Sequence, residues 1–174
     1  MTQVAIFTLG FVLILAISRR PLHNPHQHGF YRFFAMLAIL FLIVLNGPDW
    51  FLDPLSPPQI ASWLLLIASA LLAAHGFYLL RCVGHPQGPI ENTTTVVRVG
   101  AYHYIRHPLY TSLLLLAAGA AMKAPSLVGA ILTFAVAVCL VATARVEEQE
   151  NLTRFGSPYA EYMTTTRMFM PRLW

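Results

Sequence analysis

The sequence has little charge: only 10% of its 174 residues are Asp, Glu, Lys or Arg, whereas a soluble domain carries about 25%. Its two cysteines, Cys82 and Cys139, are too few for a disulfide framework. No Gly-x-Gly-x-x-Gly follows a strand pattern, which excludes a soluble nucleotide-binding fold of that type. The net charge of +4 is spread over loops and gives no support to nucleic-acid binding. These absences favour an integral membrane protein.

What the chain has instead is apolar sequence, which makes up 57% of its residues and falls into five stretches. Because a spanning helix needs about 20 residues, we predict an all-α polytopic membrane protein with about five transmembrane helices. We expect one domain over residues 1–174, with three helices in 1–80 and a loop, a hairpin and a tail in 81–174. The five expected helices cover residues 4–17, 33–45, 60–80, 109–122 and 126–144.

The last two apolar stretches are separated only by Lys123, Ala124 and Pro125, which predicts a tight helical hairpin. The first helix of this hairpin is short, so a four-span protein with a re-entrant hairpin is the alternative. The second helix is expected to continue into water as far as Arg154. A short amphipathic helix then forms a cytoplasmic tail.

The distribution of basic residues predicts the orientation. With the N-terminus outside, ten of the eleven Lys and Arg residues fall on the inner side and Lys123 alone falls outside. This asymmetry follows the positive-inside rule. We therefore expect five spans and a cytoplasmic C-terminus. The ten inner residues are Arg19, Arg20, Arg32, Arg81, Arg98, Arg106, Arg145, Arg154, Arg167 and Arg172.

Two polar groups are candidates for chemistry. Residues 100–110 place two histidines, three tyrosines and Arg106 before a membrane helix, where aromatic faces can hold a cation. An interfacial aromatic belt is the other interpretation. The adjacent carboxylates Glu147 and Glu148 are costly at a membrane helix end unless they face water or a cation. They indicate either a solvated helix exit or a binding site.

Both groups together resemble the isoprenylcysteine carboxyl methyltransferase and phospholipid methyltransferase family of membrane enzymes. The resemblance runs from about Gln87 to Pro171. The first hallmark stands at Gly100, Tyr102, Arg106, His107, Pro108 and Tyr110. The second stands at Glu147, Glu148, Leu152, Phe155, Gly156, Tyr159 and Tyr162, followed by Pro171.

The resemblance implies an S-adenosylmethionine site formed by the inner loop, the hairpin and the tail. In prenylcysteine enzymes an Arg facing the substrate precedes the Glu by four residues; that position is Thr143 here, which leaves Arg145 as the nearest candidate. Arg145, Glu148 and Arg106 are therefore the candidate catalytic residues at the rim of the site. The implied cofactor contacts are Gln87, Thr94, Thr95, Val96, Val97, Tyr102, His107, Pro108, Leu109, Tyr110 and Glu147.

The implied reaction is methyl transfer to a lipophilic substrate that enters from the bilayer at the cytoplasmic face of a membrane, with the bacterial inner membrane as the expected location. The acceptor could be a prenylcysteine-like carboxylate, a phospholipid amine or a related group. An amine would need a base, for which Glu148 and His107 are candidates. Two rivals stay open: an NADPH-dependent membrane sterol reductase, which shares an Arg-His-Pro-x-Tyr element, and a non-enzymatic lipid-binding protein.

The remaining histidines are weaker candidates. His23, His26 and His28 have a spacing that could ligate a metal, but no Cys or carboxylate joins them in the sequence, so we predict no metal site. Interfacial charge or contact with lipid headgroups is the favoured interpretation. His75 lies inside a predicted membrane helix, where a satisfied interhelical hydrogen bond is expected, although such a residue can also be functional.

Overall fold

The computed structural model describes residues 2–19, 22, 27–88, 90 and 92–171. Within these ranges the fold is all-α, and residues Ile105 and Arg167 form an isolated parallel bridge. The α-helices are α1 (Thr2–Ser18), α2 (His28–Leu45), α3 (Pro57–Cys82), α4 (Pro108–Ala121), α5 (Leu127–Phe155) and α6 (Ser157–Thr165).

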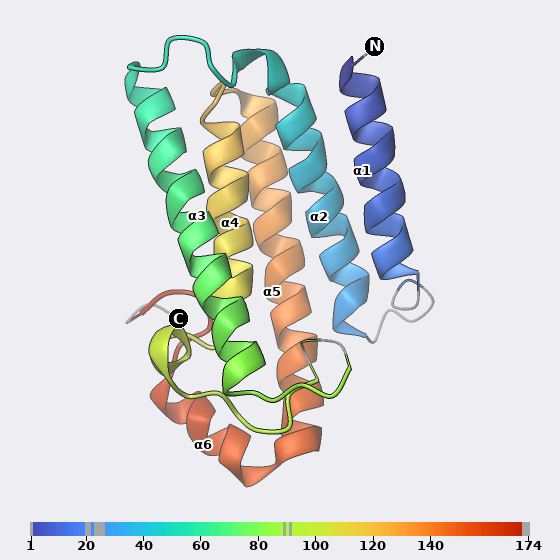
Figure 1. The fold of residues 1–174 in the computed structure, drawn as a ribbon, viewed down its shortest axis with the longest axis vertical. Coiled ribbons are helices and arrows are strands. Elements are labelled where there is room, and N and C mark those ends of the chain that lie inside the picture. The colour runs from blue at the N-terminus through green and yellow to red at the C-terminus, as the bar shows by residue number, and fades with distance from the viewer. Residues whose placement is uncertain (1, 20–21, 23–26, 89, 91, 172–174) are drawn as a thin grey trace.

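Each of the five predicted apolar helices is present, and their ends differ from the expected ones by a few residues. Helices α2, α3 and α5 are long and apolar enough to cross a membrane, whereas α1 and α4 are apolar but shorter, with 17 and 14 residues. The helices α1 to α5 run up and down side by side, and α6 lies across the end of the bundle at which α3 and α5 finish (Figure 1). The expected tight hairpin is the α4–α5 pair.

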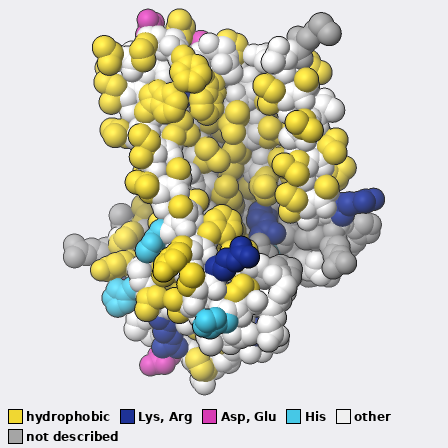
Figure 2. Space-filling view, in the orientation of Figure 1, with side chains coloured by type: hydrophobic (Ala, Val, Ile, Leu, Met, Phe, Trp, Pro, Cys, Tyr) yellow, Lys and Arg dark blue, Asp and Glu magenta, His cyan; other side chains and the backbone are white. Residues whose placement is uncertain are grey.

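The up-and-down order of the helices places the described basic residues as the sequence predicts. The segments that carry eight of the ten expected inner arginines lie at the α6 end of the bundle, and Lys123 lies in the α4–α5 turn at the other end (Figure 1). Two of the ten, Arg20 and Arg172, fall outside the described residues. Figure 2 shows hydrophobic side chains over the upper part of this face and Lys, Arg and His side chains gathered in its lower part.

The helices pack through small residues. Gly119 of α4 lies so close to α3 that an added Cβ would stand 2.9 Å from Leu66 Cδ2 and 3.2 Å from the Ser62 carbonyl oxygen. The Ser62 hydroxyl donates to the Gly119 carbonyl at 2.7 Å, and Ser69 donates to the Ser112 carbonyl at 2.7 Å. The small residues of α4 thus serve close helix approach. The core between α2, α4 and α5 contains Ala35, Leu42, Ala117, Ala120, Val136 and Leu140.

A polar group closes the end of the bundle at the α4–α5 turn, and we call it the hairpin-end cluster: Asn46, Gln59, Lys123, Trp50 and Trp63. The buried Lys123 ammonium donates to Gln59 Oε1 at 2.9 Å and lies 3.6 Å from the centroid of the Trp63 ring. Gln59 Nε2 donates to the Asp49 carbonyl at 2.6 Å, and Asn46 Nδ2 donates to the Ala120 carbonyl at 2.8 Å. The cluster therefore ties the α2–α3 connection to the hairpin.

Helix α5 extends beyond its apolar segment to Phe155, as predicted, and turns into α6 at Gly156, whose φ is +63°. Few residues other than glycine adopt such a φ. Gly156 is the N-cap of α6, and Ser157 and Pro158 are its first two residues.

Candidate functional site

The connection between α3 and α4 brings the first sequence hallmark against the bundle. Gly100 has a φ of +58°, and a Cβ there would stand 2.6 Å from His75 Nε2 and 2.7 Å from Leu79 Cδ1. Only glycine tolerates both the backbone conformation and this close approach to α3. His75 Nε2 accepts a hydrogen bond from the Ala101 N–H at 3.3 Å, so this histidine is hydrogen-bonded as expected, but its partner lies in the 3-10 turn Gly100–His103 and not in another membrane helix.

The tail after α6 fixes the residues that precede α4. The Arg106 N–H donates to the Arg167 carbonyl at 2.7 Å, and the His107 N–H donates to the Met168 carbonyl at 3.1 Å. In return, the Arg167 N–H donates to the Tyr104 carbonyl at 3.3 Å. These bonds hold the backbone of Arg106 and His107 in one place, which in turn directs their side chains toward α5.

A buried ionic network joins the two hallmarks. Arg106 Nε donates to Glu148 Oε1 at 2.6 Å, and His107 Nε2 lies 3.1 Å from the same oxygen. Arg106 Nη1 also donates to the carbonyls of Thr166 and Met163, at 2.6 Å and 3.3 Å. Burial tends to raise the pKa of Glu148, but the hydrogen bonds and positive charges of His107 and Arg106 lower it overall. Glu148 is therefore a carboxylate already engaged by its neighbours.

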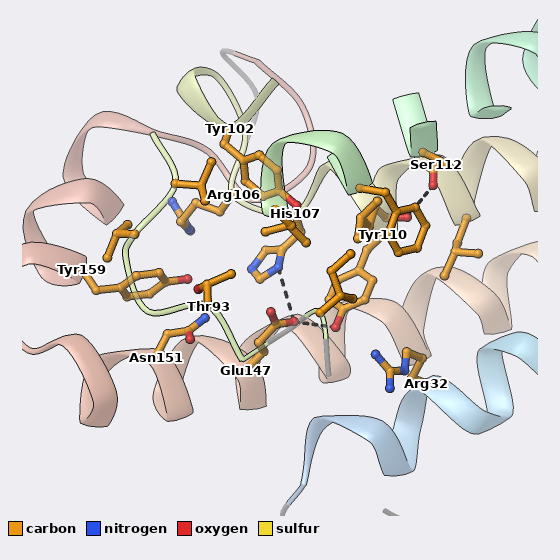
Figure 3. Close-up of a pocket in the computed structure, with 18 of the residues that line it drawn as sticks. Arg32, Thr93, Tyr102, Arg106, His107, Tyr110, Ser112, Glu147, Asn151 and Tyr159 are labelled. Atoms are coloured by element: carbon orange, nitrogen blue, oxygen red, sulfur yellow. Dashed lines mark hydrogen bonds and ion pairs between the residues drawn. The ribbon is translucent and has the colours of Figure 1, made fainter. Parts of the chain in front are cut away.

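The second glutamate has a different environment. Tyr110 Oη donates to Glu147 Oε2 at 2.5 Å, and His107 Nδ1 lies 3.8 Å from that oxygen (Figure 3). The His107 and Tyr110 rings stack with their centroids 5.3 Å apart and an interplanar angle of 12°. The side chain of Glu147 is 22% exposed, compared with 7% for Glu148. Glu147 is thus oriented by two ring residues while part of its carboxylate remains accessible. We call Arg106, His107, Tyr110, Glu147 and Glu148 the site cluster.

Glu147 borders a cavity of about 360 Å³, within the range of about 300–1,000 Å³ that is usual for small-molecule sites. The cavity is bounded by α3, α4, α5, α6, the α3–α4 connection and the start of α2. Figure 3 shows side chains from these elements converging on it. Toward the middle of the bundle its walls are apolar, formed by Met36, Ala73, Phe77 and Leu113.

Phenol rings form much of the other end of the cavity. The Tyr162 hydroxyl donates to the Tyr102 carbonyl at 2.6 Å, which ties α6 to the α3–α4 connection. Burial is the main reason why the pKa of each of Tyr102, Tyr159 and Tyr162 is raised. The nearby Glu147 charge raises that of Tyr102 further. These phenols therefore remain neutral and offer aromatic faces and O–H groups.

Of the predicted site residues, eight line this cavity: Arg106, Val96, Val97, Tyr102, His107, Leu109, Tyr110 and Glu147. Six others do not line it. Glu148 lies behind the wall, bonded to Arg106 and His107, and Pro108 is buried at the start of α4. Gln87, Thr94, Thr95 and Arg145 are exposed. The Thr94 and Thr95 hydroxyls bond to carbonyls of residues 83–85 and so shape the loop.

Several cavity residues were not expected from the sequence. Asn151 follows Glu147 by four residues, so the helical period alone places both on one face of α5. The same period directs Arg145, two residues before Glu147, to a different side. No sequence signal distinguishes the others. The further polar cavity residues are Arg32, Thr93, Ser112 and Asn151.

Part of the expected histidine group has a partner that the sequence did not reveal. His28 Nδ1 lies 2.6 Å from Glu150 Oε2, and its backbone N–H donates to Glu150 Oε1 at 3.3 Å. A carboxylate therefore does join His28, but from a distant helix. His23 and His26 lie outside the described residues. Among the residues that are described, no three His, Cys, Asp or Glu side chains form a group that could hold a metal ion.

Comparison with known protein families identifies one family for this chain. A family model described as phospholipid methyltransferase matches residues 58–157, more than half of the chain. The matched range runs from the start of α3 to the start of α6 and contains the whole site cluster. No curated protein matches the chain.

Proposed function

Because the chain belongs to the phospholipid methyltransferase family of membrane methyltransferases, we propose that it transfers a methyl group from S-adenosylmethionine to a lipophilic acceptor at the cytoplasmic face of its membrane. One observation carries the proposal: Tyr102, from the first hallmark, and Glu147, from the second, are walls of the same cavity. Their convergence supports a shared ligand rather than an interfacial aromatic belt and a solvated helix end.

The residues of the cavity fit the proposed cofactor. S-adenosylmethionine supplies an electrophilic methyl group on a positively charged sulfur. Glu147 provides a partly accessible carboxylate, and the rings of Tyr102, Tyr110 and Tyr159 provide aromatic faces; both kinds of group attract a cation. The amide of Asn151, which forms a hydrogen bond with Tyr159, and the hydroxyl of Thr93 line the cavity where the polar parts of such a molecule would lie.

The remaining charged residues of the site cluster position this wall. Arg106 and Glu148 form a pair whose side chains are 10% and 7% exposed, and Glu148 also lies against His107. Because Glu148 accepts hydrogen bonds already and has a lowered pKa, it is a poor base. We therefore assign Arg106 and Glu148 to orienting His107, which in turn contacts Glu147 and stacks on Tyr110.

The cavity also supports access from the bilayer. Its inner walls come from α2, α3 and α4 and are apolar at Met36, Phe77 and Leu113, which suits a hydrocarbon chain. Helix α4 has 14 residues and is about 21 Å long, against about 30 Å for the hydrocarbon core of a bilayer. If all five helices span the membrane, the N-terminal end of α4 lies inside the hydrocarbon core and does not reach the headgroups. A lipid then enters the cavity laterally, from within the bilayer.

The orientation rests on charge. The arginine-bearing segments gather at the cavity end of the bundle, whereas Lys123 stands at the opposite end. By the positive-inside rule the cavity end is cytoplasmic. The N-terminus, at the end of the bundle that carries Lys123, is then outside (Figure 1), and the polar methyl donor has direct access from the cytoplasm.

A methyl-transfer screen tests the proposed function. Purified protein in lipid vesicles is incubated with methyl-labelled S-adenosylmethionine and a total lipid extract, and labelled products are identified by mass. A Glu147→Gln variant serves as the inactive control, and Glu161→Gln, an exposed α6 carboxylate 72% accessible, is the matched active control. The proposal requires a labelled lipid with wild type and Glu161→Gln and loss of label with Glu147→Gln. Absence of a labelled lipid with wild type would refute the proposed function, whereas equal labelling by all three proteins would remove Glu147 from the site.

A further inference from the structure

One aromatic ring reaches the site cluster from outside the cavity. Phe169 follows α6, which ends at Thr165, and lies beyond the range matched by the family model, which ends at residue 157. The centroid of its ring is 6.0 Å from that of the His107 imidazole, with an interplanar angle of 44°. Phe169 is half-buried against the core and does not line the cavity, whereas His107 does. A ligand in the cavity can therefore contact His107 but not Phe169.

The segment that carries this ring, residues 166–169, is tied along the start of α4, and we call it the tail strap. Two of its carbonyls accept backbone N–H groups, at 2.7 Å from Arg106 and at 3.1 Å from His107. The Thr111 hydroxyl of α4 donates to the Phe169 carbonyl at 3.0 Å and to the His107 carbonyl at 3.1 Å. The backbone of Phe169 is therefore fixed relative to that of His107.

A fixed backbone does not by itself fix the plane of the imidazole. The Cβ–Cγ torsion of a histidine has broad energy wells, so packing must determine the plane of the ring. Two aromatic rings of the described chain pack against it: Tyr110, stacked at a centroid distance of 5.3 Å, and Phe169. Both distances lie in the range of about 4.5–7 Å in which aromatic pairs attract each other. Phe169 is thus the neighbour that supports His107 from outside the cavity.

The plane of this imidazole matters because both of its nitrogens face glutamates. His107 Nε2 is 3.1 Å from Glu148 Oε1, and His107 Nδ1 is 3.8 Å from Glu147 Oε2. Rotation of the ring about the Cβ–Cγ bond would lengthen both contacts. It would also change the surface that His107 presents to the cavity.

We infer that Phe169 is a positioning residue of the methyl-donor site. Its ring holds the plane of the His107 imidazole, so that Nε2 faces Glu148 and the imidazole keeps its place in the cavity wall beside Glu147. The inference rests on the proposed function, because the methyl donor is the ligand whose affinity reports on this wall. It extends the site to the tail strap, whose ring acts through His107 without touching the ligand.

A set of variants separates this role from a general effect on stability. Phe169→Leu and Phe169→Met both remove the ring and keep an apolar side chain, whereas Phe169→Tyr keeps the ring. Phe41→Leu is the matched control, because the Phe41 ring on α2 makes an edge contact with Phe7 at a centroid distance of 6.4 Å and does not line the cavity. Each purified protein is titrated calorimetrically with S-adenosylmethionine, and its thermal unfolding is recorded.

We expect the affinity of Phe169→Leu and Phe169→Met for S-adenosylmethionine to fall by about 3- to 10-fold, the change that loss of one aromatic pair implies. Phe169→Tyr and Phe41→Leu should keep the wild-type affinity. Adding Phe169→Leu to a His107→Gln variant should cause no further loss of affinity, because the residue through which the ring acts is then absent. A ring with a merely structural role would lower the affinity again in that background.

Nitrogen NMR signals of the histidine side chains test the same claim without cofactor. Protein with isotopically labelled histidine is compared with His107→Gln, which identifies the His107 signals. In Phe169→Leu and Phe169→Met these signals should shift, while those of His75, whose Nε2 is bonded to the Ala101 N–H, should stay in place. Unchanged His107 signals in both variants, or a further loss of affinity in the His107→Gln background, would overturn the inference. A folded wild type that does not bind S-adenosylmethionine, with His107 signals that shift as expected, would refute only the proposed function.

Discussion

The two ends of the helix bundle each hold a polar cluster, and they differ in what those polar groups face. In the hairpin-end cluster the Lys123 ammonium contacts Gln59 and Trp63, and none of the three lines the cavity. In the site cluster Glu147 is bonded by Tyr110 yet remains 22% exposed at the cavity wall. Buried polarity in a membrane protein is therefore not enough to indicate function. A cluster that leaves a charged atom facing a cavity is the one that can bind a ligand.

The largest expected effect is on the stability of the site cluster. Arg106→Ala leaves the Glu148 carboxylate buried without its guanidinium partner and with His107 as its remaining side-chain contact, which should reduce the free energy of unfolding by about 3–5 kcal/mol. Thermal unfolding in detergent measures this loss. The exposed pair Arg98–Glu161, with N–O distance 3.5 Å, provides the control variant Glu161→Ala, which should cost less than about 1 kcal/mol.

A double variant sharpens that result. Replacing both Arg106 and Glu148 by Met removes the uncompensated buried charge and should restore part of the lost stability. The affinity of this double variant for S-adenosylmethionine should be lower than that of the wild type, because His107 loses the residues that orient it. If Arg106→Ala unfolds at the same temperature as Glu161→Ala, the buried network does not hold the site together.

The next largest effect separates binding from stability. Glu147→Gln removes a charge from the cavity wall while keeping the shape of the side chain, so the affinity for S-adenosylmethionine should fall by about 10- to 100-fold. Because this carboxylate is partly exposed, the unfolding temperature should change little. Calorimetric titration and thermal unfolding of the same sample measure both quantities. A variant with wild-type affinity would remove Glu147 from the proposed site.

In the hairpin-end cluster, a substitution should reduce stability and leave cofactor affinity unchanged. Lys123→Met removes the bond to Gln59 and the cation–π contact with Trp63, which should reduce the free energy of unfolding by about 1–2 kcal/mol. Cofactor affinity should not change, since no residue of the cluster lines the cavity and the α4–α5 turn lies at the opposite end of the bundle from α6 (Figure 1). A parallel loss of affinity in this variant would contradict the division between a structural and a binding cluster.

The smallest expected effect is a pH dependence of stability. The pKa of Glu148 is lowered in the folded protein, so the unfolded chain takes up a proton first as the pH falls. The stabilisation is therefore complete above the ordinary Glu pKa of about 4.3 and is lost as the pH drops through the folded value. Unfolding temperatures measured from neutral pH downward should fall more steeply for wild type than for Glu148→Gln. Equal slopes would show that Glu148 is not the group responsible.

The sequence predicted the helices well because apolar length and charge asymmetry are local properties of the chain. It also predicted the cavity residues that lie in the hallmarks, such as Tyr102 and Glu147. Two outcomes on α5 could have been foreseen from the helical period: Asn151 shares a face with Glu147, and Arg145 does not. The role of Glu148 behind the wall depends on its contacts with Arg106 and His107, which only the packed structure reveals.

Contacts between elements that are far apart in the chain could not be predicted from the sequence. Nothing in the order of residues distinguishes Arg32 from the other arginines at the same end of the bundle, because its place in the cavity results from how α2 packs against α5. The pairing of His28 with Glu150 is of the same kind, since its partners come from helices far apart in the chain. The place of Arg32 and the His28–Glu150 pair both depend on tertiary packing, whereas each hallmark can be recognised within one segment of the sequence.

The central claim is that the cavity between the tyrosines and Glu147 binds a positively charged methyl donor. Calorimetric titration of the purified wild-type protein with S-adenosylmethionine, and separately with NADPH, tests it most directly. We predict saturable binding of S-adenosylmethionine with one site per chain and no heat of binding for NADPH. A folded protein that binds NADPH, or that binds neither molecule, would contradict the account.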